Sequence, residues 1–299
     1  MTTRLPFEFA DWLRLREPAD AAARSAELVD VLRRQLPAER PVVVHDLGSG
    51  TGSMARWLAP RLPGTQHWVL HEWDAGLLAR APSELHATDG GPVTVATRNS
   101  DITRLTAADL ADAHLITASA LLDMLTAEEV ERIVAACAGH PTFFALTVVG
   151  RAEFTPAEPL DADFTAAFNA HQRRTVDGRA LLGPDAVDVT VSAFRRQGVD
   201  VRVRSSPWRL GPEHPTLTAE WLAGWLDAAV EERPELGRAV GAYRNRRLAA
   251  IDAGRLRVVL HHVDLLAGCL LGGSATVGDP AYGEGRCAKP ARPAAPDGG

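Results

Sequence analysis

Short apolar runs alternate with segments of helical spacing along most of the chain. Apolar side chains at helical intervals predict two helices between residues 8 and 37, which meet at a bend at Pro18. Apolar runs then predict strands over 42–46, 68–72, 93–97, 114–118 and 142–149, with helical patterns over 54–62, 75–81, 107–110 and 127–138. Strands that alternate with helices favour right-handed crossovers and a parallel sheet.

The pattern changes after Gly150. A Pro- and Asp-rich connection leads into a short helix near 164–174 and a Gly/Pro turn at 182–184, which we interpret as an insertion. The core resumes with a helix over 185–197 and a strand over 199–208, followed by helical patterns over 219–232 and 236–253 and a last strand over 256–266. The prediction is a doubly wound, Rossmann-like α/β fold with a seven-stranded sheet.

These patterns divide the chain into three parts. Residues 1–40 are predicted to form an N-terminal helical lid, and residues 41–271 a catalytic domain with cap insertions at 151–184 and 212–254. Residues 272–299 are rich in Gly, Pro and Ala and too poor in large apolar side chains to pack, so we predict a disordered tail.

Composition and net charge limit the classes of partner expected for this protein. The net charge of −6 gives no broad attraction to phosphate backbones or anionic lipid, and no apolar stretch is long enough for a membrane span. The three cysteines form no C-x-x-C pair, which favours a reducing compartment, and the N-terminus has no apolar signal segment, so we expect a cytoplasmic protein. His261 and His262 are adjacent on a strand and are expected to face opposite sides, so we predict no metal site.

The clearest motif lies where the first strand turns into a helix, and it reads Asp46-Leu-Gly48-Ser49-Gly50-Thr-Gly52. Glycines let the backbone approach a ligand closely, and the helix that opens here offers unpaired N–H groups. A dinucleotide fingerprint requires a third glycine at position 53, which is Ser53. Asp46 would also repel a pyrophosphate and suits a cationic ligand instead.

The motif resembles the first motif of the class I S-adenosylmethionine-dependent methyltransferases, acidic-x-Gly-x-Gly-x-Gly. The resemblance implies that S-adenosylmethionine is the cofactor and that this loop holds its methionine part. It also implies an antiparallel last strand. At the end of the second strand it implies that Glu72 accepts the ribose hydroxyls, with Asp74 as the alternative. Trp73, which follows Glu72, is also expected at the cofactor.

The next two strand ends extend the resemblance. Asp101 and Ile102 occupy the positions that contact the adenine in the family, although an Asp after a strand is often only a helix cap. Ser119 and Asp123 follow the fourth strand, at the carboxyl edge where ligands bind in open α/β sheets. Asp123 either contacts cofactor or substrate or caps the following helix.

Motifs of nucleic-acid methyltransferases are missing, since no Asn-Pro-Pro-Tyr-like or Pro-Cys run is found. The sequence therefore predicts methyl transfer to an oxygen or nitrogen of a small molecule. His171, in the insertion, is the predicted base and Asp123 its rival. A non-catalytic S-adenosyl-binding regulatory protein and an NAD-dependent reductase remain alternatives. The acceptor's identity, the role of helices 212–254 and the oligomeric state, including a homodimer, stay open.

Overall fold

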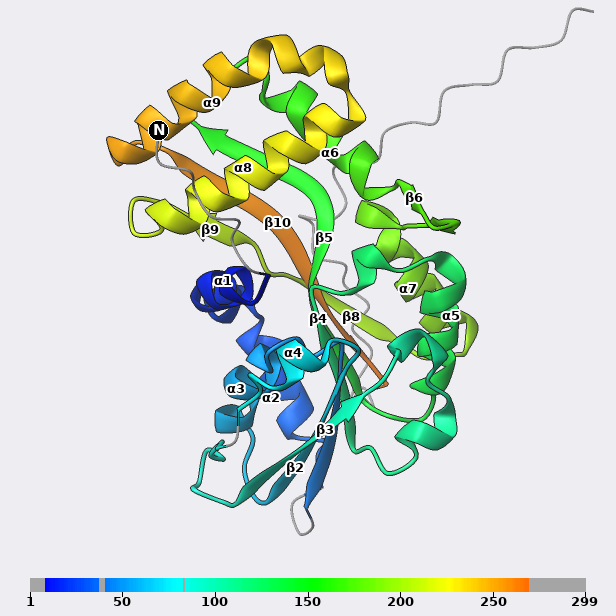
Figure 1. Ribbon diagram of the computed structural model, residues 1–299. Helices are drawn as coiled ribbons and strands as arrows, with labels where there is room; N and C mark the ends of the chain where they lie inside the picture. The colour runs from blue at the N-terminus through cyan, green and yellow to red at the C-terminus, as the bar shows by residue number, and fades with distance from the viewer. Residues whose placement is uncertain (1–8, 38–40, 83, 269–299) are drawn as a thin grey trace, which may run out of the picture.

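The computed structural model describes residues 9–37, 41–82 and 84–268. One twisted sheet runs through the molecule in the order β3-β2-β1-β4-β5-β10-β8, with β9 paired to the outer part of β10 (Figure 1). The strands are β1 (Val42–Leu47), β2 (Gln66–Glu72), β3 (Val93–Asn99), β4 (Leu115–Ser119), β5 (Thr142–Thr155), β8 (Val201–Ser205), β9 (Trp208–Leu210) and β10 (Arg257–Ala267).

The sheet has the predicted doubly wound topology. Strands β1 to β5 pair in parallel, whereas β10 is antiparallel to β5 and β8. The Rossmann-like fold with an antiparallel last strand is therefore confirmed. The predicted strand over 199–208 divides into β8 and β9 around Ser206 and Pro207, because the proline has no N–H for a ladder and the two pieces pair with different parts of β10.

Helices cover both faces of the sheet. On one face, α2 (Ala26–Arg33) and α3 (Ser53–Leu58) pack their apolar sides against β1 and β2. On the other, α5 (Ala127–Ala136) and α7 (Ala186–Arg196) enclose a second core against β4 and β5. The short α4 (Ala75–Leu78) follows β2, and the predicted helix at 107–110 is a 3₁₀ turn.

A third core lies beyond the sheet. Strand β5 does not end at Val149 as predicted but continues to Thr155, because β10 pairs with it as far as Arg257. The two long strands carry a cap of three helices, α6 (Asp161–Gln172), α8 (Pro215–Glu232) and α9 (Gly237–Asp252) (Figure 1). Phe154, Phe164 and Trp225 are buried between the strands and these helices. The two predicted insertions thus pack against each other.

The N-terminal segment differs from its prediction. Helix α1 (Phe9–Ala23) continues through Pro18, and the bend comes at Ser25, whose side chain accepts the N–H of Leu28 and so caps α2. A proline inside a helix removes one hydrogen bond without ending the helix where packing holds it. The tail predicted to be disordered, 272–299, lies outside the described residues. Within the described ranges, no helix is long and apolar enough to cross a membrane.

Candidate active site

A cavity of about 1510 Å³ opens at the carboxyl ends of the parallel strands. Its floor comes from the ends of β1, β2 and β4, and its walls come from α1, α6, α8 and β10. Ligands of open α/β sheets bind at this edge. The cavity brings together every residue named above as a candidate except Gly52, which lies in the turn beside it.

The glycine loop after β1 has the left-handed backbone that glycine tolerates. Gly48, Gly50 and Gly52 have φ angles of +62°, +55° and +81°. A Cβ on Gly48 would lie 2.9 Å from Leu121 Cδ1, and one on Gly52 would lie 2.6 Å from Pro82 Cδ. All three glycines thus suit the backbone angle, and at Gly52 the rigid Pro82 ring also leaves no space for a side chain.

Two buried polar atoms beside this loop have no hydrogen-bond partner among the described residues. Asp46 accepts the Thr117 hydroxyl at 2.7 Å through Oδ1, while its Oδ2 and the Ser49 hydroxyl are left unpaired. Burial raises the pKa of Asp46 to about 7. Both residues line the cavity, so a ligand that carries a positive charge and hydrogen-bonding groups would satisfy them.

Glu72 is fixed at the end of β2 by backbone donors. Its Oε2 accepts the Gly50 N–H at 2.9 Å, and its Oε1 accepts the N–H groups of Trp73 and Asp74 at 3.0 and 3.2 Å. The carboxylate is therefore held in one orientation at the cavity edge. Asp74 instead accepts the N–H groups of Gly76 and Leu77 and caps α4, so the geometry favours Glu72 over Asp74 as a ligand for a vicinal diol.

Apolar and polar side chains line the cavity next to Glu72. Trp73 is 78% exposed and lies at the cavity mouth, and Ile102 is buried in its wall. Asp101 caps the short turn that begins at Ile102 by accepting from Thr103, and it also lines the cavity. A flat ring bound in this part of the cavity could contact the apolar side chains of Trp73 and Ile102, next to the Asp101 carboxylate.

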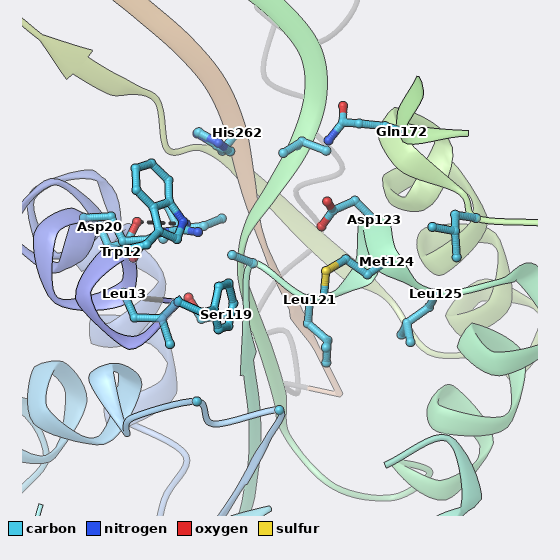
Figure 2. A pocket seen from close by; sticks show the side chains of 18 of the residues that line it. Trp12, Leu13, Asp20, Ser119, Leu121, Asp123, Met124, Leu125, Gln172 and His262 are labelled. Atoms are coloured by element: carbon cyan, nitrogen blue, oxygen red, sulfur yellow. Dashed lines mark hydrogen bonds and ion pairs between the residues drawn. The ribbon is translucent and has the colours of Figure 1, made fainter. Parts of the chain in front are cut away.

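Ser119 and Asp123 lie deeper in the cavity. The Ser119 hydroxyl accepts from Arg24 at 3.0 Å, so its hydroxyl is oriented by a buried cation. Figure 2 shows the Asp123 carboxylate pointing into the cavity, between Ser119 and Gln172. Burial raises the pKa of Asp123 above its usual range. Thr126, not Asp123, caps α5, which removes the alternative role of Asp123.

His171 lies at the cavity wall in the last turn of α6. Its Nε2 is 3.3 Å from Glu231 Oε2 of α8 but makes no hydrogen bond, and its Nδ1 is 3.2 Å from Arg174 Nη1. The His171 ring thus lies against Glu231 and Arg174, whereas the Asp123 carboxylate points into the cavity (Figure 2). The geometry favours Asp123 over His171 as the group that would accept a proton from a bound acceptor.

Sequence reasoning assigned no role to several residues that line the same cavity. Trp12 and Arg16 of α1, Trp208 of β9 and His262 of β10 are among them. A signal was present for the first two, since Trp12, Arg16 and Asp20 are spaced by four residues and share one helix face. Trp208 and His262 carry no such signal because only strand pairing brings them to the cavity.

The two adjacent histidines differ from the expected arrangement. A bulge separates Leu260 from His262 in the pairing with β5, so simple alternation is interrupted, and both His261 and His262 line the cavity. His262 is buried against Trp208, with ring centroids 5.7 Å apart, and burial lowers its pKa to about 3. The described residues contain no cluster of three or more His, Cys, Asp or Glu that could hold a metal ion.

Comparisons with known proteins find similarity in fold but not in sequence. No family model and no curated protein matches the chain. Among solved structures, the chain is similar to the cyclopropane synthase MmaA2 from Mycobacterium tuberculosis, with 13% identity, TM-score 0.45 and coverage of 86% of this chain and 93% of the other. It is also similar to an S-adenosylmethionine-dependent methyltransferase from Geobacter sulfurreducens in complex with S-adenosylhomocysteine, with 16% identity, TM-score 0.41 and coverage of 85% and 97%. Because these scores are low, the fold assignment rests on the strand order and the function on the site.

Proposed function

We propose that this protein is an S-adenosylmethionine-dependent methyltransferase that acts on an oxygen or nitrogen of a small molecule. The observation that carries the proposal is the pair of unpaired buried atoms, Asp46 Oδ2 and Ser49 Oγ, beside a left-handed glycine loop. This arrangement fits a ligand with a charged amino group and a nearby sulfonium. Glu72 supports it, because an oriented carboxylate at the next strand end suits a ribose diol.

Each part of the cofactor has a candidate partner. Asp46, Ser49 and the backbone of Gly48 and Gly50 would hold the methionine part, and Glu72 the ribose. Trp73, Ile102 and Asp101 would hold the adenine, and Ser119 lies between the cofactor end and the acceptor end of the cavity. When bound, S-adenosylmethionine supplies an electrophilic methyl group on sulfur.

The chain's own contribution to catalysis is alignment and proton removal. Side chains from α1, α6 and α8 line the acceptor end and would position a bound acceptor. Asp123 would accept a proton from a hydroxyl or amine, and the raised pKa of this carboxyl brings it nearer to neutral pH, where a base is effective. On this proposal residues 1–40 act as a lid, since Phe9, Trp12 and Leu13 of α1 line the cavity.

The acceptor proposed here is a small molecule rather than a nucleic acid. The net charge of −6 offers no broad basic surface, and four tryptophans line the acceptor end: Trp12, Trp208, Trp221 and Trp225. We place the reaction in the cytoplasm, in keeping with Cys137, a buried free thiol. A homodimer remains part of the proposal to be tested by mass photometry.

Ligand-dependent melting tests the proposal directly. S-adenosylhomocysteine is expected to raise the melting temperature, because a ligand that binds only the folded state stabilises it by mass action. NADH is expected to leave it unchanged. Absence of S-adenosyl binding by calorimetry at about millimolar ligand would refute the proposal. Binding without methyl transfer to any of a broad set of acceptors would instead favour a non-catalytic binding protein.

A further inference from the structure

Helix α1 places three polar and aromatic side chains along the cavity wall. Trp12, Arg16 and Asp20 lie one turn apart and all three line the cavity. Arg16 donates to Asp20 through Nε at 3.0 Å and Nη2 at 3.1 Å, and Trp208 of β9 donates its Nε1–H to Asp20 Oδ1 at 2.9 Å. Asp20 is only 4% exposed, so the carboxylate that fixes the Arg16 guanidinium is buried.

Two tryptophan rings pack against this guanidinium. Its central carbon lies 4.9 Å from the Trp208 ring centroid and 6.0 Å from that of Trp12. A guanidinium has five N–H donors, and Asp20 takes one on Nε and one on Nη2. Among the described residues, no acceptor contacts Nη1. The N–H groups left for a further ligand therefore include those of the end-on edge, formed by Nη1 and the second hydrogen of Nη2.

That edge has the geometry of a carboxylate receptor. Two parallel N–H groups match the two oxygens of a planar carboxylate, and a lysine could not offer this pair. A phosphate dianion fits less well, because Asp20 and Asp123 already bring negative charge to the same cavity. The adjoining wall is apolar and partly aromatic, with Leu13, Phe168, Trp221 and Leu260.

The α1 side of the cavity faces the side that holds Asp123. Figure 2 shows Trp12 and Asp20 on one side of the cavity and Asp123 on the opposite side, with Ser119 between them. An acceptor anchored on the α1 side would thus direct its other end toward Asp123. Arg174, in the same cavity, contacts His171 and makes no ion pair with an acid among the described residues, so it adds positive charge on the far wall.

We propose that Arg16 binds a carboxylate of the acceptor, which makes the substrate a small organic acid with an apolar, ring-sized body and a separate hydroxyl or amine that is methylated. This inference rests on the proposed methyltransferase function, and it adds the class of substrate. Asp20 and Trp208 act as positioning residues, since they hold the Arg16 guanidinium in one plane.

The test is a binding titration of the wild-type protein, with and without saturating S-adenosylhomocysteine. The ligands are a panel of hydroxybenzoates and hydroxycinnamates, each compared with its carboxamide. Acids from the panel are expected to bind about tenfold or more tightly than their amides, since a charge-assisted pair is lost with the carboxylate. Arg16→Gln is expected to remove that preference, and Arg16→Lys to retain part of it. Arg14→Gln is the matched control, because Arg14 is on the same helix but exposed and outside the cavity.

The outcomes separate the two proposals. Equal binding of acids and amides, an unchanged acid preference in Arg16→Gln, or no binding of any acid at about 10 mM would overturn the substrate class. The comparison of acids with amides uses the wild-type protein and so does not depend on a variant that folds. S-adenosylhomocysteine affinity is measured on the same samples. If it is absent, the methyltransferase proposal fails, whereas its presence without any acid preference refutes only the inference about Arg16.

Discussion

At the scale of single residues, carboxylates that look alike in the sequence have different tasks in the structure. Glu72 accepts three backbone N–H groups and keeps a fixed orientation at the cavity, whereas Asp74 caps α4. Asp46 is buried and Asp123 is half-buried at the cavity, and both carboxyls have raised pKa values. Their surroundings differ, because a threonine hydroxyl contacts Asp46 whereas the Asp123 carboxylate points into the cavity (Figure 2). Environment, not residue type, separates binding groups from capping groups.

Glu72→Gln tests the ribose assignment. The amide retains one acceptor oxygen and loses the charge, so affinity for S-adenosylhomocysteine is expected to fall by about 1–3 kcal/mol in calorimetry. Asp74→Asn is the matched control, because asparagine also caps helices and should leave affinity unchanged. A loss confined to Asp74→Asn would move the ribose contact to that residue.

Asp123→Asn tests the base assignment. With a hydroxyl acceptor, kcat is expected to fall about 10²-fold or more while S-adenosylhomocysteine affinity changes only a few-fold, because only the transition state loses its proton acceptor. His171→Ala, which removes a contact to Glu231, is expected to have the smaller effect on kcat. The reverse order of effects would assign the base role to His171, and full turnover in both would show that proximity alone suffices.

At the scale of elements, a buried carboxylate joins the N-terminal helices to the sheet. Asp264 of β10 accepts the Ser25 N–H, at the start of α2, at 2.7 Å and the Leu146 N–H of β5 at 2.8 Å. Leu146 has a left-handed backbone with φ of 57°, which breaks the regular ladder and turns its N–H toward Asp264. This contact fixes where α1 enters, and therefore where Trp12 and Arg16 face the cavity.

Asp264→Ala is expected to lower the free energy of unfolding by roughly 2–4 kcal/mol, because the buried N–H of Leu146 and the half-buried N–H of Ser25 lose their acceptor. Urea denaturation followed by tryptophan fluorescence measures the change. Asp264→Asn retains one acceptor oxygen, so its free energy of unfolding should lie between those of the wild type and Asp264→Ala. The control is Asp200→Ala, which removes an exposed carboxylate just before β8 and should change stability by less than about 0.5 kcal/mol.

At the scale of the whole molecule, the cavity lies between a Rossmann-like core and a helical cap that share two strands. Strands β5 and β10 extend from the core into the cap, so the two parts are joined by a continuous antiparallel ladder (Figure 1). Burial disfavours the charged forms of groups in this cavity, among them His262 and Asp46. The ionisation of these groups is therefore linked to the stability of the fold.

The pH dependence of stability follows from Asp46. Its pKa is raised from 3.8 to about 7 in the folded protein, so between these values the folded state binds more protons than the unfolded state. Asp46 therefore makes the ligand-free protein less stable as pH rises from about 4 to about 7. Asp46→Asn removes this contribution, and its stability relative to wild type is expected to increase across that range. Urea midpoints of both proteins at several pH values measure it, and a difference that is constant or decreases with pH contradicts the assignment.

Much of the core was predictable because its signals are local. Apolar runs such as Val42 to Val44, and the turn that follows them, depend on nearest neighbours in the chain. Glycines at 48, 50 and 52 indicate a left-handed backbone, which other residues adopt only with strain. The capping box of Thr126 and Glu129 is equally local and is present in the structure. The parallel pairing then follows from the alternation of strands and helices, and the antiparallel last strand from the family resemblance.

The sequence by itself determined the parallel core, the turn after the first strand and the polar residues at the strand ends. Tertiary structure decided where β5 ends, since its outer half is a strand only because β10 pairs with it, and it decided that α1 passes through Pro18. It also decided the acceptor end of the cavity. Arg16 and Trp208 are 192 residues apart in the chain and meet only through α1, β9 and Asp20. Contacts at such separation leave no periodic pattern, because they depend on packing between elements and not on spacing within one.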